Sequence, residues 1–390
     1  MKATEALTRL RVVIASHVLL SGPPQELEHF LRFRVSSLLF IGHPLNFDGN
    51  KSRATLHEEG IRLHSYTSRW IAPGLLSYFK DFLLTTYWCL RHHRRIDVFV
   101  GADGLLALAG VTLKKLGFVK IVVFYSIDYV PTRFKSRMLN RLYHNVERWS
   151  IRGADVVWNL AEAMILARRN SGILTNSSAL QIVVREGAHF ERIQRVNVDH
   201  GDKFSLVFLG HLRKRQGLEL LIDTLPLIFK RWPDATLTVI GSGPLSTLIA
   251  ERVTNLGISG RVRLLGFIED HRVVERILTQ CGIGLAPYEP DRESFSWYTE
   301  PGKTKQYLAC GLPIIITDVP ASARVIQAEG AGLIMDYSSD GLIDCLSEIW
   351  DDTARYSNMR ENAFKLGAEA DWKIIFTRAL DQTLPLLKQS

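Results

Sequence analysis

The sequence predicts an α/β protein made of two doubly wound, Rossmann-like domains. Short runs of Val, Ile and Leu alternate with helix-length segments, which is typical of parallel strands covered by helices on both faces. The alternation stops at residues 191–203, a polar segment without periodicity that we interpret as a linker, and then starts again. With 390 residues, 46% of them hydrophobic, the chain is long enough to bury two cores.

The first domain is predicted over residues 1–195, with six strands at residues 10–16, 36–42, 96–102, 120–126, 154–160 and 181–184. The second is predicted over residues 204–370, with six strands at residues 204–210, 235–241, 261–266, 282–287, 312–317 and 331–336. Residues 371–390 follow as an amphipathic helix that is expected to pack back on the first domain. Ligands of parallel sheets bind beyond the carboxyl ends of the strands, so we expect the two domains to face each other across a cleft that holds the active site.

Positive charge is concentrated in the first half of the chain. Residues 1–200 contain 27 Lys and Arg against 16 Asp and Glu, whereas residues 201–390 contain 21 against 24. The first half is therefore expected to face something anionic. No nucleic-acid recognition motif is present, and an anionic membrane surface or a lipid-linked substrate fits the asymmetry at least as well. We expect no nucleic-acid partner.

The location is predicted from what the chain lacks. The four cysteines form no CxxC pair, which fits a reducing cytoplasm and argues against a zinc site. The N-terminus has no signal-peptide pattern, and no apolar run approaches the length of a membrane span. The sequence thus predicts a cytoplasmic protein, with peripheral attachment to the inner face of the membrane left open.

One segment, residues 73–95, joins ten large apolar residues to a basic end. A helix of this kind can lie on an anionic membrane, with Arg91, Arg94 and Arg95 near the lipid phosphates. It can also be a core helix whose basic end interacts favourably with its own dipole. We favour the core helix.

Glycines and basic residues directly follow two strands of the second domain. In GHLRKRQG, residues 210–217, Gly210 lets a ligand approach the backbone, and Arg213 and Lys214 add positive charge; a basic solvated loop is an equal alternative. In GSGP, residues 241–244, Gly241 and Gly243 open a tight turn, and the proline suits the first turn of a helix.

The stretch EPGKTKQYLACGLPIII, residues 300–316, places a cation and an amide at the start of a short helix that precedes a buried strand. Lys303 and Gln306 lie where the helix offers unpaired N–H groups and partial positive charge, which favours anion binding. Taken alone, a solvated lysine on an ordinary αβ unit is the more common explanation.

In this order, and with RVRLLGFI and IGLAPY between them, the motifs resemble the nucleotide-sugar-binding domain of GT-B glycosyltransferases, particularly family 4 and related exopolysaccharide enzymes. The resemblance covers residues 204–336 well and the first domain only in outline. It implies transfer of a sugar from a nucleotide-diphosphate sugar to a hydroxyl acceptor, a glycan or a lipid-linked saccharide, in cell-surface polysaccharide or glycolipid synthesis. The chain contains no DxD motif, so neither a metal at the diphosphate nor a cofactor is expected.

The resemblance assigns roles to the motif residues. Lys303 would neutralise the donor diphosphate, and Gln306 would bind the ribose hydroxyls, where the family often has glutamate. Phe267 lies where relatives hold the nucleobase through backbone groups. Tyr288 would contact the diphosphate or the sugar, although a half-buried loop tyrosine is an equal alternative.

The chain departs from the family at three further positions. His211 and Gln216 replace an arginine and a lysine of many members, so a cation of the 213–215 loop is expected to supply the missing charge. Tyr298 stands where retaining members tend to have glutamate, which puts retention in doubt. Three glutamates lie nearby: Glu289, Glu293 and Glu300.

The first domain offers a candidate general base, Asp128, directly after the buried strand that ends at residue 126. Inverting transfer needs a base to take the acceptor's proton, and some GT-B relatives use an aspartate in the corresponding region. The alternative is a helix N-cap or an Asx-turn before Pro131. Asp103 and His17 are further acceptor-side candidates, with helix capping and a structural histidine as their respective alternatives.

Two other functions share this architecture. A nonhydrolysing nucleotide-sugar 2-epimerase would need no acceptor. A two-lobed ligand-binding protein is a further alternative, against which the missing signal-peptide pattern counts.

Overall fold

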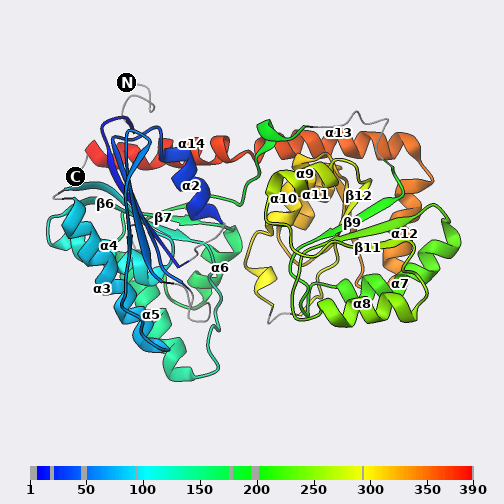
Figure 1. The fold of residues 1–390 in the computed structure, drawn as a ribbon, viewed down its shortest axis with the longest axis horizontal. Coiled ribbons are helices and arrows are strands. Elements are labelled where there is room, and N and C mark those ends of the chain that lie inside the picture. Colours follow the sequence, from blue (N-terminus) through cyan, green and yellow to red (C-terminus); the bar gives the residue numbers. More distant parts are fainter. Residues whose placement is uncertain are drawn as a thin grey trace. The chain divides into compact units, whose positions relative to one another are not determined.

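The structure, a computed structural model, describes residues 7–17, 22–44, 51–93, 95–174, 179–194, 202–291 and 294–388. The chain forms two compact units, one of Met1–Arg185 with Lys373–Ser390 and the other of Glu186–Trp372. Each unit has its own largely parallel sheet with helices on both faces (Figure 1). The predicted fold class of two Rossmann-like domains is thereby confirmed. Most of the predicted linker, residues 195–201, lies outside the described residues.

The first unit contains an eight-stranded sheet in the order β4-β3-β2-β1-β5-β6-β7-β8. Its strands are β1 (Arg11–Ser16), β2 (Ser37–Gly42), β3 (Arg53–Glu58), β4 (Ile61–Thr67), β5 (Ile96–Gly101), β6 (Val119–Ser126), β7 (Val156–Asn159) and β8 (Leu180–Val183). The six predicted strands are all present, within two residues of their predicted ends. The antiparallel hairpin of β3 and β4 at the edge was not predicted.

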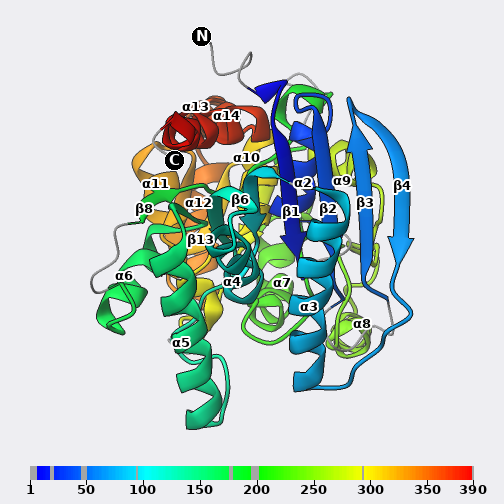
Figure 2. The same ribbon diagram turned by 90° about the vertical axis from the view of Figure 1, so that its left-hand side faces the viewer.

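Helices cover both faces of this sheet (Figures 1 and 2). One face carries α3 (Leu75–His92), α4 (Gly104–Lys115) and α5 (Arg137–Gly153). The other carries α2 (Pro23–Leu31) and α14 (Trp372–Thr383), whereas α6 (Glu162–Asn170) lies beside α5, where its Arg168 pairs with Glu147. The returning helix α14 is fixed here by the Phe30 and Phe376 rings, 5.6 Å apart, and by a 3.0 Å hydrogen bond from Trp158 Nε1 to Thr383 Oγ1.

Helix α3 packs with its polar side inward. Ser77, Lys80, Asp81 and Thr85 are buried. Its large apolar side chains are exposed instead, namely Leu75, Leu76, Phe79, Leu83, Tyr87 and Leu90. The expectation of a core helix is therefore wrong for these six side chains. Arg94, assigned to the basic end of this segment, lies outside the described residues. No described helix is long and apolar enough to cross a membrane.

The second unit contains a parallel six-stranded sheet in the order β11-β10-β9-β12-β13-β14. Its strands are β9 (Ser205–Leu209), β10 (Thr236–Ile240), β11 (Val262–Leu264), β12 (Ile283–Ala286), β13 (Ile314–Thr317) and β14 (Gly332–Met335), again within two residues of prediction. One face packs on α7 (Leu218–Arg231), α8 (Ser246–Asn255) and α12 (Ser339–Trp350). The other packs on α9 (His271–Leu278), α10 (Gly302–Ala309), α11 (Ser322–Ala328) and α13 (Thr353–Glu369).

Candidate functional site

The strand order of the second unit reverses between β9 and β12, which is where parallel sheets bind ligands. The loops that follow these two strands are tied together there. Arg215 Nη2 lies 2.5 Å from Asp291 Oδ2, and the Arg215 carbonyl accepts a 3.2 Å hydrogen bond from Glu289 N–H. Gly217 has a φ of 74°, and a Cβ at this position would lie 1.6 Å from the Pro287 oxygen. Only glycine fits at position 217, so this close contact between the two loops depends on a residue without a side chain.

Lys303, the second residue of α10, reaches into this loop cluster. Its Nζ donates to Gln216 Oε1 at 3.0 Å and lies 4.3 Å and 4.8 Å from the ring centroids of Phe208 and Tyr288. A Cβ at position 210 would come within 3.1 Å of Lys303 Cε and Nζ, so Gly210 leaves the space that the lysine uses. The structure thus brings together three predicted donor-site residues, Gly210, Tyr288 and Lys303.

The ammonium group of Lys303 forms no ion pair with any carboxylate of the described residues. Glu300, the nearby acid, pairs instead with Lys305 at 2.5 Å. Burial, helped by the charge of Arg213, lowers the pKa of Lys303 to about 7. The site therefore holds a cation whose charged form would be favoured by a bound anion.

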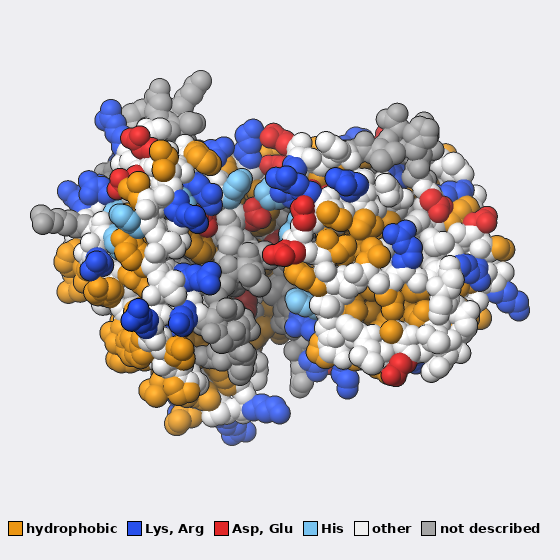
Figure 3. Space-filling model, viewed as in Figure 1, with side chains coloured by type: hydrophobic (Ala, Val, Ile, Leu, Met, Phe, Trp, Pro, Cys, Tyr) orange, Lys and Arg blue, Asp and Glu red, His pale blue; other side chains and the backbone are white. Residues whose placement is uncertain are grey.

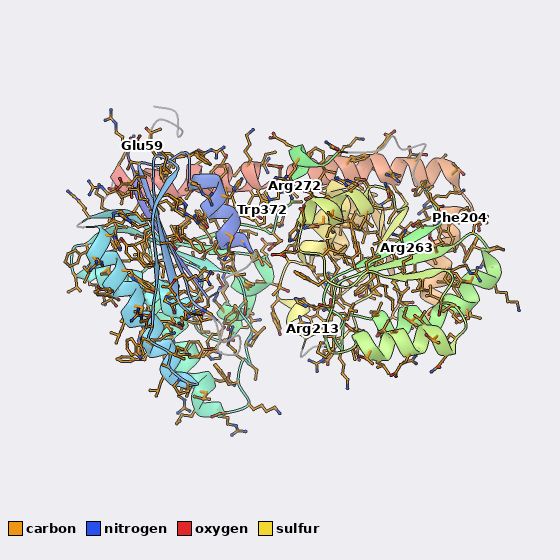
Figure 4. All side chains as sticks on the ribbon, in the orientation of Figure 1. Glu59, Phe204, Arg213, Arg263, Arg272 and Trp372 are labelled. Atoms are coloured by element: carbon orange, nitrogen blue, oxygen red, sulfur yellow. The ribbon has the colours of Figure 1, made fainter. Side chains whose placement is uncertain are left out.

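Where many family members have an arginine and a lysine, this chain has His211 and Gln216, and other side chains supply part of the missing charge. Gln216 supplies a neutral acceptor for Lys303, where a second lysine would repel it. Arg213, labelled in Figure 4 in the loop after β9, is exposed and close enough to affect the pKa of Lys303. Lys214 is also exposed, whereas Arg215 is held by Asp291. Of the three loop cations, Arg213 is the one that contributes charge at Lys303.

Gln306, one turn after Lys303, has a buried side-chain oxygen with no hydrogen-bond partner among the described residues. Its Nε2 lies 3.4 Å from His271 Nδ1. A buried carbonyl oxygen without a donor costs free energy until a ligand hydroxyl or N–H reaches it. Phe267 follows Gly266, and its side chain is 71% exposed.

The two glycines of GSGP serve close packing of the backbone. A Cβ on Gly241 would lie 1.9 Å from the Gly210 oxygen, and one on Gly243 would lie 2.5 Å from the Leu212 oxygen. The β9 and β10 loops therefore touch directly. Helix α8 begins at Ser246, two residues after the predicted helix-opening Pro244, so that prediction was wrong in detail.

Tyr288 is buried, which contradicts the half-buried alternative, and burial raises the pKa of its phenol. Tyr298, at the position of the family's glutamate, is half-buried. Of the three neighbouring glutamates, Glu300 is buried against Lys305, Glu289 is half-buried, and Glu293 lies outside the described residues. Because Glu300 already pairs with Lys305, its carboxylate is not free to take the role of the family's glutamate.

The first unit contains a pocket of about 400 Å³ between α3, α4, α5 and the end of β6. Its walls are mainly apolar, with Leu75, Phe79, Phe124, Phe134, Leu139 and Val146 among them. Its polar lining includes all three predicted first-domain residues, His17, Asp103 and Asp128. Residues far apart in the sequence thus share one pocket.

His17, at the end of β1, lies between two carboxylates. Its Nδ1 is 2.5 Å from Asp103 Oδ2, and its Nε2 is 3.3 Å from Asp81 Oδ2. Although burial acts to lower it, these two acids together raise the pKa of His17 to about 9. Asp103 also caps α4 by accepting from Leu106 N–H at 3.0 Å, so the expected capping role is confirmed.

The charged imidazolium makes stability dependent on pH. Because the folded-state pKa lies above the unfolded value near 6.5, its contribution is complete below pH 6.5 and is lost as the pH rises through 9. We expect His17→Asn to lose on the order of 1–3 kcal/mol of unfolding free energy at pH 6 and much less at pH 9.5. Denaturant titrations at both pH values, with His64→Asn on the exposed edge strand as control, measure this. An equal loss at both values would contradict the ion-pair explanation.

Asp128 has an exposed carboxylate that pairs with Arg133, at 2.8 Å and 3.3 Å. It caps no helix, since α5 begins at Arg137 with Ser136 as its N-cap. The N-cap alternative is therefore wrong. Pairing with one guanidinium leaves carboxylate lone pairs free to accept from a ligand hydroxyl.

A buried ion pair under the pocket was missed. Arg168 and Glu147 lie 2.7 Å apart, both almost inaccessible, and Arg168 also donates to Ser126 and Asn159. Glu147 and Ser126 line the pocket, so Arg168 supports its floor. Within the described residues, no three His, Cys, Asp or Glu side chains are arranged to hold a metal ion.

Comparisons with known proteins agree with this architecture. The family described as "Glycosyl transferases group 1" matches residues 203–352. N-acetyl-alpha-D-glucosaminyl L-malate synthase of Bacillus anthracis is 26% identical over 230 residues, which cover 56% of each chain. A phosphatidyl-myo-inositol mannosyltransferase of Mycobacterium leprae is 25% identical over 45% of each chain. The chain spans about half the length, or less, of the curated relatives it matches first.

Solved structures resemble the chain over nearly its whole length. Sucrose-phosphate synthase from Thermosynechococcus elongatus has a TM-score of 0.72 at 14% identity, covering 97% of this chain and all of the other. Anabaena Alr3699/HepE in complex with UDP-glucose has a TM-score of 0.68 at 14% identity, with the same coverage. The chain thus has the two-domain GT-B fold of glycosyltransferases. The match to the group 1 glycosyltransferase family lies within its second domain.

Proposed function

We propose that the protein transfers a sugar from a nucleotide-diphosphate sugar to a hydroxyl group of a glycan or lipid-linked saccharide. The observation that carries this proposal is the ammonium group of Lys303, which lacks a carboxylate partner among the described residues and lies in the first turn of α10. A diphosphate supplies the negative charge that this site lacks, and Arg213 and the helix N–H groups add to its stabilisation. In this proposal, these groups stabilise the leaving diphosphate without a metal or a cofactor.

The comparisons suggest which substrates to test first. Alr3699/HepE has been solved with UDP and with UDP-glucose, so uridine diphosphate sugars are the first donors to try. The mannosyltransferases are named for a phosphatidylinositol acceptor, which supports a lipid-linked acceptor. We place the reaction in cell-surface polysaccharide or glycolipid synthesis, at the cytoplasmic face of the membrane.

For the stereochemistry we propose inversion, with Asp128 as the general base. A single displacement needs a group that removes the acceptor's proton. The exposed carboxylate of Asp128 on the pocket wall supports this role. A trehalose-6-phosphate synthase studied for transfer with retention has a TM-score of 0.71 at 14% identity, a likeness that concerns the fold alone.

The donor site is tested by titrating UDP-glucose into the protein in a calorimeter. Lys303→Ala should bind about ten- to a hundredfold more weakly at pH 6, because a charge-assisted hydrogen bond contributes about 1.5–3 kcal/mol. Wild-type affinity should fall as the pH rises past 7, since binding then requires uptake of a proton by Lys303. A nucleotide sugar has no terminal phosphate that titrates near pH 6, so a fall in affinity above pH 7 would come from a group of the protein.

Lys303→Arg is the matched control, because a guanidinium stays charged throughout this range and should remove the pH dependence. Unchanged affinity in Lys303→Ala would refute the diphosphate assignment.

An assay of the wild-type protein with donor alone distinguishes a glycosyltransferase from an epimerase. Isomerised nucleotide sugar formed without an acceptor would identify an epimerase.

A further inference from the structure

Two exposed apolar stripes border the pocket of the first unit. On α3, Leu75, Leu76 and Phe79 are 57%, 64% and 61% exposed, and on α5, Met138 and Leu142 are 77% and 54% exposed. Leu75, Phe79 and Leu142 also line the pocket. The apolar pocket walls therefore continue without interruption into exposed apolar surface. Figure 3 shows hydrophobic side chains gathered over α3 and α5, with Lys and Arg among them.

The outward orientation of the α3 stripe is fixed by buried charges. Lys80 Nζ lies 2.9 Å from Asp81 Oδ1, and the same carboxylate contacts His43 and His17. Rotating α3 to bury its leucines would break this network and expose Trp88, which is 4% accessible. The apolar side is therefore committed to facing outward.

Helix α5 presents three different surfaces, as its period of 3.6 residues per turn requires. Leu139, Tyr143 and Val146 line the apolar pocket. The exposed stripe of Met138, Leu142 and Trp149 comes next around the helix. Beyond it, a second pocket of about 340 Å³ is lined by Arg137, Arg141, Arg148 and His144. An apolar stripe thus lies between an apolar pocket and a row of arginines.

We propose that the α3–α5 surface docks on an anionic phospholipid bilayer, and that the apolar pocket receives the lipid portion of the acceptor from it. Leu76, Met138 and their neighbours enter the acyl region, while the arginine row contacts lipid phosphates. This assignment of a lipid-linked acceptor rests on the proposed transferase function. The docking itself does not.

Charge and shape favour a bilayer over a protein partner. Apolar side chains bordered by arginines match the boundary between acyl chains and anionic headgroups. The first 200 residues carry a net positive charge, as such a surface requires. A second copy of this chain would instead bring the two arginine rows together, with like charges in contact.

The test is co-sedimentation of the full chain with vesicles of phosphatidylcholine alone, or of equal parts phosphatidylcholine and phosphatidylglycerol. The wild-type protein should bind only the anionic vesicles and be released by high salt. Leu76→Ser/Met138→Ser should bind them at least about tenfold more weakly. Replacing Arg137, Arg141 and Arg148 by Gln should cost roughly a hundredfold, at about fivefold for each charge. Leu227→Ser/Leu248→Ser, on exposed leucines of the second unit, is the control and should bind normally.

The pocket is tested separately by native mass spectrometry with phosphatidylglycerol. One lipid should remain bound to the wild-type protein. Val146→Phe or Leu139→Phe should lose this lipid while still sedimenting with vesicles.

Equal binding to neutral and anionic vesicles, or normal binding of the Leu76/Met138 variant to anionic vesicles, would overturn the docking proposal. So would a wild-type dimer that this variant converts to monomer. Retention of lipid by both folded Phe variants would overturn the pocket assignment. None of these results would change donor binding in solution, so the docking proposal can be wrong while the proposed transferase function is right.

Discussion

Asp128→Asn is expected to lose turnover by about 10²–10⁴-fold, the usual contribution of a general base. The amide keeps the shape of the side chain but cannot take a proton from the acceptor. Donor affinity should not change, because the donor-site residues belong to the other unit. Stability should hardly change either, since an exposed ion pair with Arg133 contributes about 0–1 kcal/mol. Steady-state kinetics, calorimetry and thermal melting together check this result.

Arg133→Met is the matched control, because it breaks the same ion pair but leaves the carboxylate in place. If Asp128 only ordered its loop through Arg133, both variants would lose activity to a similar extent. Near-normal turnover of Asp128→Asn would refute the base role. A product whose NMR spectrum shows the anomeric configuration of the donor would refute inversion.

Arg168→Met is expected to destabilise the protein by about 3–5 kcal/mol, the cost of leaving a buried charge without its partner. Glu147 would remain under the pocket with no cation to neutralise it. Burial already raises the pKa of Glu147 above its usual value, and without Arg168 the pKa would rise further. Below that raised pKa the folded protein holds a neutral carboxyl group. The loss should therefore be larger at pH 8 than at pH 5, as measured by denaturant unfolding.

The neighbouring Arg169 is exposed, so Arg169→Met should change stability by less than about 0.5 kcal/mol. The double variant Arg168→Met/Glu147→Met should recover most of the loss, because two apolar groups replace the pair. A double variant as unstable as Arg168→Met alone would show that packing, and not charge, explains the effect.

The sequence was sufficient to predict the strands that form the two cores. Strands covered on both faces must be apolar throughout, so runs such as residues 120–126 are recognisable without structural information. The β3–β4 hairpin lies at a sheet edge, and every residue of β4 except Tyr66 is exposed. Such a strand needs no apolar pattern, and its sequence IRLHSYT offered none.

The candidate site was predictable where local chain geometry determines it. Lys303 was found because a Pro-Gly break and a helix start place it in a first turn. Arg168 was missed because the letters LARRN do not distinguish the buried arginine from its exposed neighbour. The protonation state of His17 depends on Asp81 in α3 and on Asp103 at the N-cap of α4, both distant from His17 in the sequence. Such contacts follow from tertiary packing alone.

Under the proposed transferase function, the lowered pKa of Lys303 also bears on how the reaction cycle ends. A nucleoside diphosphate has a terminal phosphate that the nucleotide sugar lacks, and so gains negative charge above pH 6. A permanently charged cation would hold this product more tightly than the substrate, and product release is rate-limiting in many enzymes. In the empty site Lys303 returns its proton to water near pH 7, so holding the product above this pH requires uptake of a proton, which weakens product binding. The glutamine at position 216, a neutral partner in place of a second cation, therefore favours rapid emptying of the site.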